Sequence, residues 1–314
     1  MRRLYLLVLC LLCAIPLLNA QITETVLVDL VDLYISATDE KGHFVTDLKQ
    51  QEILVSEDGV PQKIQRFGAF AGERNEIPLL LALVIDNSAS MDAEISEIKK
   101  LDIARDAGLT LLKELGPMDR VKLVQFSDTI KQTELTSNKD QIITELNQMR
   151  PRWWHTAMFD ALASTIRDLG TQPGRKILLV CSDGMDNMSK STLAEVVDIA
   201  SRTPELTVIV LGTVGNRPVL GMRGKVQSMP ALPMFRGKEI LQTLADKTAG
   251  YAFFPKNFKE SEKMFQLLRS FVRSQYYLAY RSTNAKLDGS YRKIQLQTKR
   301  TGVKLHYRTG YYAN

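Results

Sequence analysis

The sequence predicts an α/β fold: a doubly wound, mostly parallel sheet with helices on both faces, inserted in a small β-sandwich built from the N- and C-terminal flanks. Between residues 79 and 273, apolar strand-like runs alternate with helical periods, which is typical of a parallel sheet covered by helices. In both flanks, apolar residues recur at every second position, as in half-buried strands. The flanks also carry opposite net charges, so we expect them to pair.

The strands and turns of the flanks are indicated by alternation and by turn residues. In the N-terminal flank, apolar residues alternate through 26–35, a turn is expected at 39–42, and Glu-Asp-Gly at 57–59 predicts a hairpin. In the C-terminal flank, two alternating segments, 294–298 and 303–307, are joined by an expected turn.

The central region divides into apolar runs and helical periods. The runs predict strands at 79–85, 121–126, 177–181, 207–211 and 251–254. Helices are predicted at 95–115, 139–149, 157–169, 191–202, 238–248 and 258–273. The segment between them at 214–237, rich in Gly, Pro and Met, is predicted to be a long irregular loop.

Charge is segregated along the chain. Residues 21–75 carry five Lys/Arg and ten Asp/Glu, whereas residues 275–314 carry eight Lys/Arg and one Asp. Pairing of the two flanks explains this pattern, because basic and acidic residues then meet in one sandwich. Binding of nucleic acid or anionic lipid by the basic flank is the alternative. We expect no nucleic-acid partner, since the basic residues alternate with apolar ones.

Length and composition bound the domain organisation. The 314 residues, 24% charged and 45% hydrophobic, are typical of a soluble globular chain and exclude a disordered, collagen-like or multi-span membrane protein. Four segments are predicted: a signal peptide at 1–20, half-sandwiches at 21–75 and 273–314, and the α/β domain at 76–272.

The first twenty residues have the order of a secretory signal peptide. Arg2 and Arg3 precede an apolar run at 4–18, and small Ala20 precedes polar Gln21. We expect cleavage after Ala20 and a secreted, periplasmic or cell-envelope location. An uncleaved membrane anchor and a lipid anchor are the alternatives, and membrane contact is expected only if the segment is uncleaved.

Cysteine usage excludes a disulfide framework. The chain has three cysteines, and cleavage after Ala20 removes two of them, leaving Cys181. Cys181 ends an apolar run, so we interpret it as a buried small hydrophobic residue. A catalytic thiol would need an activating base, which the sequence does not indicate.

An acid and two hydroxyls follow the first central strand. Asp86, Ser88 and Ser90 are spaced two residues apart, so in an extended segment their side chains share one side. They stand where open α/β sheets place ligands, at the carboxyl end of a strand. Hard oxygen ligands suit Mg²⁺, Mn²⁺ or Ca²⁺. Asp and Ser are also ordinary turn and capping residues, and that alternative stays open for these three alone.

Two further positions belong to the same pattern. Thr156 precedes a predicted helix, and Asp183 follows another apolar strand within Ser182-Asp183-Gly184. Each has a structural alternative: Thr156 as a helix N-cap and Asp183 as a turn residue. The joint order of the five residues is more specific than any one of them.

This set resembles the metal-ion-dependent adhesion site of the von Willebrand factor type A domain, over roughly residues 76–272. The flanks resemble those of a family of secreted bacterial proteins related to that domain, through 58–67, 244–251, 275–280 and 308–312. The resemblance implies that five residues hold one divalent cation, Mg²⁺ first and Mn²⁺ or Ca²⁺ as alternatives. These residues are Asp86, Ser88, Ser90, Thr156 and Asp183.

The resemblance also implies a function and its partner. Ser88 and Ser90 would bind the ion directly, Asp86 directly or through water, and Thr156 and Asp183 would complete the shell. The open position would accept a carboxylate, so the expected partner is a protein with an exposed Asp or Glu. Two carboxylates only balance a divalent cation, which leaves it receptive to an anion. The expected function is adhesion or scaffolding; the alternative is a structural subunit of an envelope assembly in which the ion only stabilises.

Residues around the five ligands support them or line the rim. The family has small residues before the Thr, whereas this chain has Trp154 and His155, and the tryptophan forms a contact surface or packs under the loop. We do not expect His155 to bind the metal. Asp160 stands one helical turn after Thr156 and supports it, or is simply an acid favoured at a helix start. Two more candidates for these roles are Asn87 and Asp186.

Signatures of an enzyme are missing from the sequence. It contains no Gly-x-x-x-x-Gly-Lys loop, no Gly-x-Ser-x-Gly elbow and no His-Glu-x-x-His helix. A bound metal ion can activate water, but no general base is evident beside the set. We therefore expect no catalysis, with a metal-dependent hydrolase as the least favoured alternative.

Overall fold

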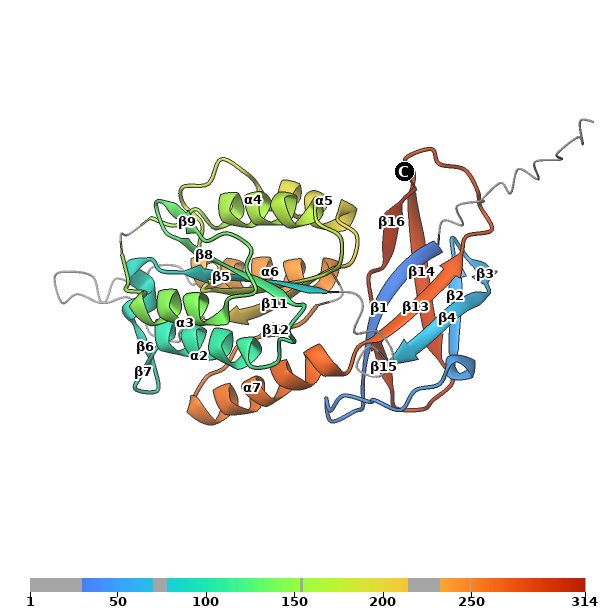
Figure 1. Ribbon diagram of the computed structural model, residues 1–314, viewed down its shortest axis with the longest axis horizontal. Helices are drawn as coiled ribbons and strands as arrows, with labels where there is room; N and C mark the ends of the chain where they lie inside the picture. Colours follow the sequence, from blue (N-terminus) through green and yellow to red (C-terminus); the bar gives the residue numbers. More distant parts are fainter. Residues whose placement is uncertain (1–29, 70–77, 153–154, 214–231, 249, 314) are drawn as a thin grey trace, which may run out of the picture.

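The computed structural model describes residues 30–69, 78–152, 155–213, 232–248 and 250–313. A helix-covered sheet and a two-sheet sandwich lie side by side (Figure 1). Both flanks of the chain enter the sandwich, and the central region forms the other part. The predicted fold class is confirmed. The signal peptide and its cleavage point lie outside the described residues, as do Trp153 and Trp154.

The central sheet has six strands in the described part of the chain, in the order β12-β11-β10-β5-β8-β9. All neighbouring pairs are parallel except β8 with β9. The strands are β5 (Leu79–Asp86), β8 (Arg120–Phe126), β9 (Ile130–Gln132), β10 (Arg175–Ser182), β11 (Leu206–Gly212) and β12 (Ala252–Phe253). Strands β5 and β10 are buried at every position, which explains their continuous apolar runs.

Helices cover both faces of this sheet. Alternate residues of β5 separate the two cores: Leu81 and Leu83 face α2, α3 and α7, whereas Leu80 and Ala82 face α4, α5 and α6. The helices are α2 (Lys100–Leu112), α3 (Lys139–Gln148), α4 (Met158–Gly170), α5 (Leu193–Arg202), α6 (Leu232–Lys247) and α7 (Phe258–Arg273). Among the described residues, no helix combines the length and the apolar character that crossing a bilayer requires.

The sandwich consists of two four-stranded sheets, each with strands from both flanks. Their orders are β15-β1-β13-β4 and β16-β14-β2-β3, and every pairing is antiparallel. The strands are β1 (Leu30–Thr38), β2 (Ile53–Glu57), β3 (Val60–Gln62), β4 (Ile64–Ala69), β13 (Tyr276–Arg281), β14 (Tyr291–Thr298), β15 (Lys304–His306) and β16 (Gly310–Tyr312). The inserted arrangement predicted from alternation and charge is therefore present.

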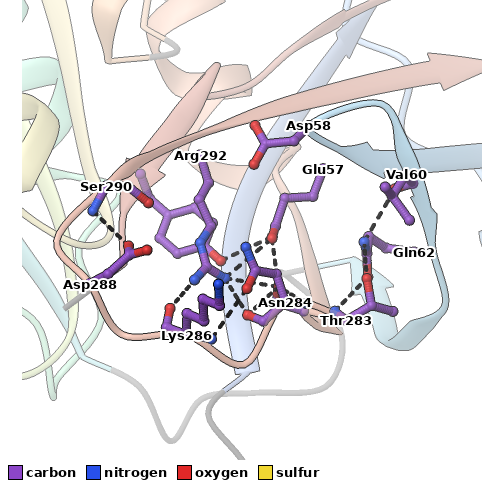
Figure 2. Close-up of polar contacts among 12 residues, drawn as sticks. Glu57, Asp58, Val60, Gln62, Thr283, Asn284, Lys286, Asp288, Ser290 and Arg292 are labelled. Carbon is purple, nitrogen blue, oxygen red and sulfur yellow. Dashed lines mark hydrogen bonds and ion pairs between the residues drawn. The ribbon is translucent and has the colours of Figure 1, made fainter.

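Ion pairs join the two flanks, as their opposite charges predict. Arg300 binds Asp47 at 2.6 Å and Glu52 at 2.9 Å. Inside the sandwich, Arg292 is paired with Glu57 at 3.4 Å, and both side chains are only 2% exposed. Figure 2 shows the polar cluster around this buried pair. Each pair connects residues more than two hundred positions apart, so the flanks fold as one unit.

Aromatic contacts pack the sandwich against the α/β part. Phe44 lies against Phe271 of α7 with ring centres 5.9 Å apart. The guanidinium of Arg202, at the end of α5, lies 3.8 Å from the ring centre of Tyr312. Helix α7 also continues directly into the sandwich through β13. Both covalent continuity and side-chain packing therefore connect the two parts.

The structure differs from the prediction in three places. The helix predicted over 95–115 begins only at Lys100, because β6 (Glu94–Ile95) and β7 (Ile98–Lys99) form a hairpin through Ser96 and Glu97, both with positive φ. Helix α6 begins at Leu232, inside the segment predicted as irregular, of which 214–231 lie outside the described residues. Strand β9 was not predicted, because its three residues are exposed and lack an apolar pattern.

Candidate metal site at the carboxyl edge of the central sheet

The strand order of the central sheet places the predicted ligands at one edge. The chain runs from β5 to β8 on one side of β5, and returns to β10 on the other, so the order reverses between β5 and β10. Open α/β sheets bind ligands at such a point, outside the carboxyl ends of the strands. Asp86 ends β5, and Asp183 follows Ser182 at the end of β10.

Asp86 is the buried centre of this edge. Its carboxylate accepts hydrogen bonds from the Ser88 amide and the Ser182 hydroxyl, both at 2.9 Å. Burial, together with the negative charge of Asp183, raises the pKa of Asp86 to about 7, although hydrogen bonds from Ser88 and Ser182 oppose the rise. The raised pKa means that the buried site disfavours the ionised carboxylate. A cation added beside it would favour the ionised form.

The two serines after β5 lie together. Ser88 Oγ and Ser90 Oγ are 3.1 Å apart, so both hydroxyls point at one place. Ser88 is buried and Ser90 is exposed. The 3₁₀ turn η2 (Ala89–Asp92) starts there, and the cap Ser88 makes no side-chain capping bond. The capping interpretation requires the Ser88 hydroxyl to bond to the start of this turn, and it does not do so.

Asp183 is positioned by a tight approach of two backbones. Gly184 has φ +80°, and an added Cβ there would stand 2.4 Å from the carbonyl oxygen of Gly237 in α6. Only glycine fits both conditions. The carboxylate of Asp183 accepts the Met185 amide at 3.2 Å through Oδ1, and its Oδ2 lies 3.4 Å from the ammonium of Lys100.

Thr156 is held at the same edge by its backbone. Its amide donates to Asn187 Oδ1 at 2.8 Å, and the next amide, of Ala157, donates to the carbonyl of Ser127, just after β8. Helix α4 begins at Met158 with Ala157 as its N-cap and without a side-chain cap bond. The interpretation of Thr156 as a helix N-cap is therefore wrong.

The supporting residues have well-defined contacts. Asp160 accepts the amides of Lys190 and Ser191 at 3.0 and 2.8 Å, and so fastens α4 to the loop after β10. Asp186, which lies in the loop after β10, accepts the Phe159 amide of α4 at 2.8 Å and so makes a second connection between this loop and α4. These acids hold the loop that carries Asn187, which in turn binds the Thr156 amide.

Two more residues were expected at the rim. Asn87 is buried, its backbone bridges β8 and the loop before α4, and its Oδ1 has no hydrogen-bond partner among the described residues. His155 is exposed. Trp154, the remaining rim candidate, lies outside the described residues.

Lys100 is a contributor that sequence reasoning missed. Its ammonium lies 3.4 Å from Asp183 Oδ2, and the two side chains are only 8% and 12% exposed. Lys100 is the first residue of α2. A cation is disfavoured at a helix N-terminus by the helix dipole, which is the signal that could have singled it out.

The donor set at this edge suits a hard cation. It consists of carboxylate and hydroxyl oxygens, with no sulfur or imidazole, which favours Mg²⁺, Mn²⁺ or Ca²⁺ over Zn²⁺. In the described part of the chain, no group of three or more His, Cys, Asp and Glu side chains could hold a metal ion. The predicted set has only two carboxylates beside its three hydroxyls, and its binding of a metal ion stays a prediction.

Cys181 lies just beneath the site in β10 and is buried. Burial raises the pKa of its thiol well above the ordinary range, and the nearby charge of Asp86 raises it further. The thiol is therefore kept protonated and inert, as expected for a small hydrophobic residue in a core.

Residues 81–185 match the family model of the von Willebrand factor type A domain. The central part of this chain is a von Willebrand factor type A domain. The matched segment begins in β5 and ends just after Gly184, so it includes all five predicted ligands. The narrower resemblance of the flanks to secreted bacterial relatives stays a prediction.

Solved structures resemble the chain at low identity. One is the conserved hypothetical protein BatB from Bacteroides thetaiotaomicron, at 20% identity and TM-score 0.47, over 63% of this chain and 100% of that one. Another is a von Willebrand factor type A protein from Catenulispora acidiphila, at 11% and 0.48, over 90% and 72%. The PilB minor pilin from Streptococcus sanguinis follows at 14% and 0.47, over 63% and 62%. No curated protein matches the chain.

Proposed function

We propose that this chain is an exported, non-catalytic protein-binding module that captures a carboxylate of a partner protein through a divalent cation. Asp86, Ser88 and Ser90 would hold the cation from β5, and Thr156 and Asp183 from the two neighbouring loops. When bound, the cation would supply a positive charge with an open coordination position beside the two carboxylates. The partner would be an adhesion or scaffold protein with an exposed Asp or Glu.

The observation that carries the proposal is the pairing at the switch point. The hydroxyl of Ser182 bridges β10 to Asp86 at 2.9 Å, and so fixes the adjacent Asp183 beside the end of β5. Strands in one sheet lie only about 4.8 Å apart, so the two carboxylates share one small space. Two negative groups so close favour an accompanying cation, and in the described part of the chain only Asp183 of the two has an ion-pair partner, Lys100.

The rim of the site suits a protein partner. Met185 and Met188 follow Asp183 and are large apolar side chains exposed by 39% and 51%. Methionine adapts its shape to different apolar surfaces, which makes it common where proteins bind one another. An acidic residue flanked by apolar ones would therefore suit this edge.

Metal binding is the first experiment. Titration of the purified protein with Mn²⁺ or Mg²⁺ by calorimetry should show one site, and Asp86→Asn and Asp183→Ala should abolish it. The control is Asp92→Asn, because this acid is more than half exposed and pairs with Lys99 on the surface. Absence of any divalent binding by the wild type would overturn the proposal.

Partner capture is the second experiment. Crosslinking at the cell envelope should recover the same protein from wild type in Mg²⁺ and lose it in EDTA or with Asp183→Ala. Capture that survives both treatments, with a lower melting temperature in EDTA, would support the structural-subunit alternative instead. Metal-dependent turnover in a broad hydrolase screen would support the third alternative.

A further inference from the structure

A buried lysine shares a carboxylate with the proposed cation site. Lys100 Nζ lies 3.4 Å from Asp183 Oδ2, whereas Oδ1 of the same group accepts the Met185 amide. Lys100 is 7% exposed overall, so little solvent screens its charge. The oxygen of Asp183 that does not accept the Met185 amide is therefore the one beside the ammonium.

The local fold forces the lysine into this place. The β6–β7 hairpin turns through two non-glycine residues with positive φ, Ser96 and Glu97, and leads directly into α2. The Lys100 amide donates to the Ala93 carbonyl at 2.9 Å, which fixes the first turn of α2 against η2. The helix dipole and burial both disfavour an ammonium at this position, and the ion pair with Asp183 compensates this cost.

Another buried lysine, Lys122 of the central sheet, provides a contrast to Lys100. Lys122 in β8 pairs with Asp168, whose side chain is 52% exposed, and it also donates to Gln132 at 3.1 Å. Its register partner is Ala82, four residues before Asp86, so it lies toward the other edge of the sheet. Lys122 forms its ion pair with an acid at the surface, whereas Lys100 forms its ion pair with a proposed metal ligand.

We propose that Lys100 is an internal counter-cation that competes with divalent ions for Asp183 and so weakens the cation affinity of this site. An ammonium and a divalent ion at one carboxylate repel each other strongly in surroundings of low dielectric. Uptake of a divalent ion therefore requires the lysine head group to leave Asp183. The site then fills only at high divalent concentration, which makes capture of a partner sensitive to the ion concentration outside the cell. This inference rests on the proposed function, because it concerns the same ligands.

The test compares Mn²⁺ dissociation constants, measured by calorimetry and by the electron paramagnetic resonance signal of free Mn²⁺. Lys100→Met removes the charge and keeps the length of the side chain, and it should lower Kd by about tenfold or more. Lys100→Gln is the second variant, in case the first does not fold. Lys122→Met is the matched control for loss of a buried lysine and should leave Kd within about twofold, as should Lys99→Met for loss of a neighbouring surface charge.

A double-mutant comparison locates the effect. In an Asp183→Asn background, Lys100→Met should no longer tighten Mn²⁺ binding, because the shared carboxylate is gone. Circular dichroism and melting curves verify the fold of each variant. A gain that persists without Asp183 would show a general charge effect and would overturn the competition.

The outcomes separate this inference from the proposed function. If wild type and Lys100→Met bind Mn²⁺ equally, or the variant binds more weakly, the competition is overturned and the metal site stands. If neither binds, both are overturned. If only Lys100→Met binds, the competition is supported, and metal-dependent capture by the wild-type chain is rejected.

Discussion

Two buried carboxylates of this chain, Glu57 in the sandwich and Asp86 at the edge of the central sheet, have opposite surroundings. Both side chains are almost inaccessible to solvent. Glu57 accepts hydrogen bonds from three hydroxyls and one guanidinium, those of Tyr280, Ser282, Tyr311 and Arg292. Asp86 accepts one amide and one hydroxyl and faces a second carboxylate, Asp183.

The difference fits a structural role for Glu57 and the proposed binding role for Asp86. The charge of Glu57 is balanced by Arg292, whose guanidinium also donates to the carbonyls of Asn284 and Lys286 and so closes the loop before β14 (Figure 2). Both carboxylate oxygens of Glu57 are thus saturated with hydrogen bonds, which leaves this group no capacity for a ligand. Asp86 has no cation of its own in the described part of the chain, and a group of this kind favours an added one.

The largest expected effect is on the saturated cluster. Glu57→Gln keeps the shape of the side chain but leaves the buried Arg292 charge without a partner, which should lower the free energy of unfolding by about 3–5 kcal/mol. Urea denaturation at pH 7 measures it. The control Asp47→Asn removes an exposed acid that binds Arg300 and should change stability little. A loss from Glu57→Gln no larger than that of the control would contradict the role given to the cluster.

Asp86→Asn should have the opposite sign at neutral pH. In EDTA, the folded pKa of Asp86 is about 7 against 3.8 in the unfolded chain, so folding takes up a proton between these values. The free energy of unfolding of the wild type should therefore fall as pH rises from about 4 to 7, by about 2–4 kcal/mol. Asp86→Asn should flatten that decline. A decline of equal slope in the variant would show that another group causes it.

The parts of the fold that the sequence predicts are those with a local signal. Strands such as 79–85 are apolar at every position, because both of their faces are covered by helices. Flank pairing follows from charge, which is a property of whole segments. The helix over 95–115 was placed too early, because Ile95 and Ile98 fit a helical period although the backbone at Ser96 and Glu97 turns into a hairpin.

Side-chain partners separated by long stretches of chain could not be predicted. Lys100 and Asp183 are 83 residues apart, and Glu57 and Arg292 are 235 apart. Nothing in the spacing of such residues indicates a contact, since the fold alone brings them together. The five candidate ligands were recognised as a set only because their order resembles a known site, and their binding of a metal ion stays a prediction.

Addition of Mg²⁺ should reduce the contrast between the two carboxylates. Ligand binding to the folded chain stabilises it by about 2.7 kcal/mol at a hundredfold excess over Kd. The gain should be the same in Glu57→Gln as in wild type, because the two carboxylates share no hydrogen-bond partner among the described residues. It should vanish in Asp86→Asn. Urea denaturation in Mg²⁺ and in EDTA measures all three. A gain in Asp86→Asn equal to that of the wild type would place the ion elsewhere.

The smallest expected effect concerns Asp160, whose carboxylate is paired less completely than that of Glu57 but does not face a second carboxylate as Asp86 does. Partial burial acts to raise the pKa of Asp160, but hydrogen bonds from two backbone amides outweigh it, so the pKa is lowered. Its contribution to stability is therefore present above about pH 4 and lost as pH falls through the lower, folded pKa, opposite to Asp86. Asp160→Asn should cost about 1 kcal/mol at pH 7, measured by urea denaturation.

The same variant decides whether Asp160 also supports the site. If the loop it fastens positions Asn187 and hence Thr156, Asp160→Asn should weaken Mn²⁺ binding by about tenfold, the usual size for a residue that orients a ligand. Unchanged Mn²⁺ affinity together with the loss of stability would assign Asp160 to the helix–loop junction alone. The distinction matters because Thr156 lies on a loop, and a proposed ligand on a loop is only as well placed as the contacts beneath it.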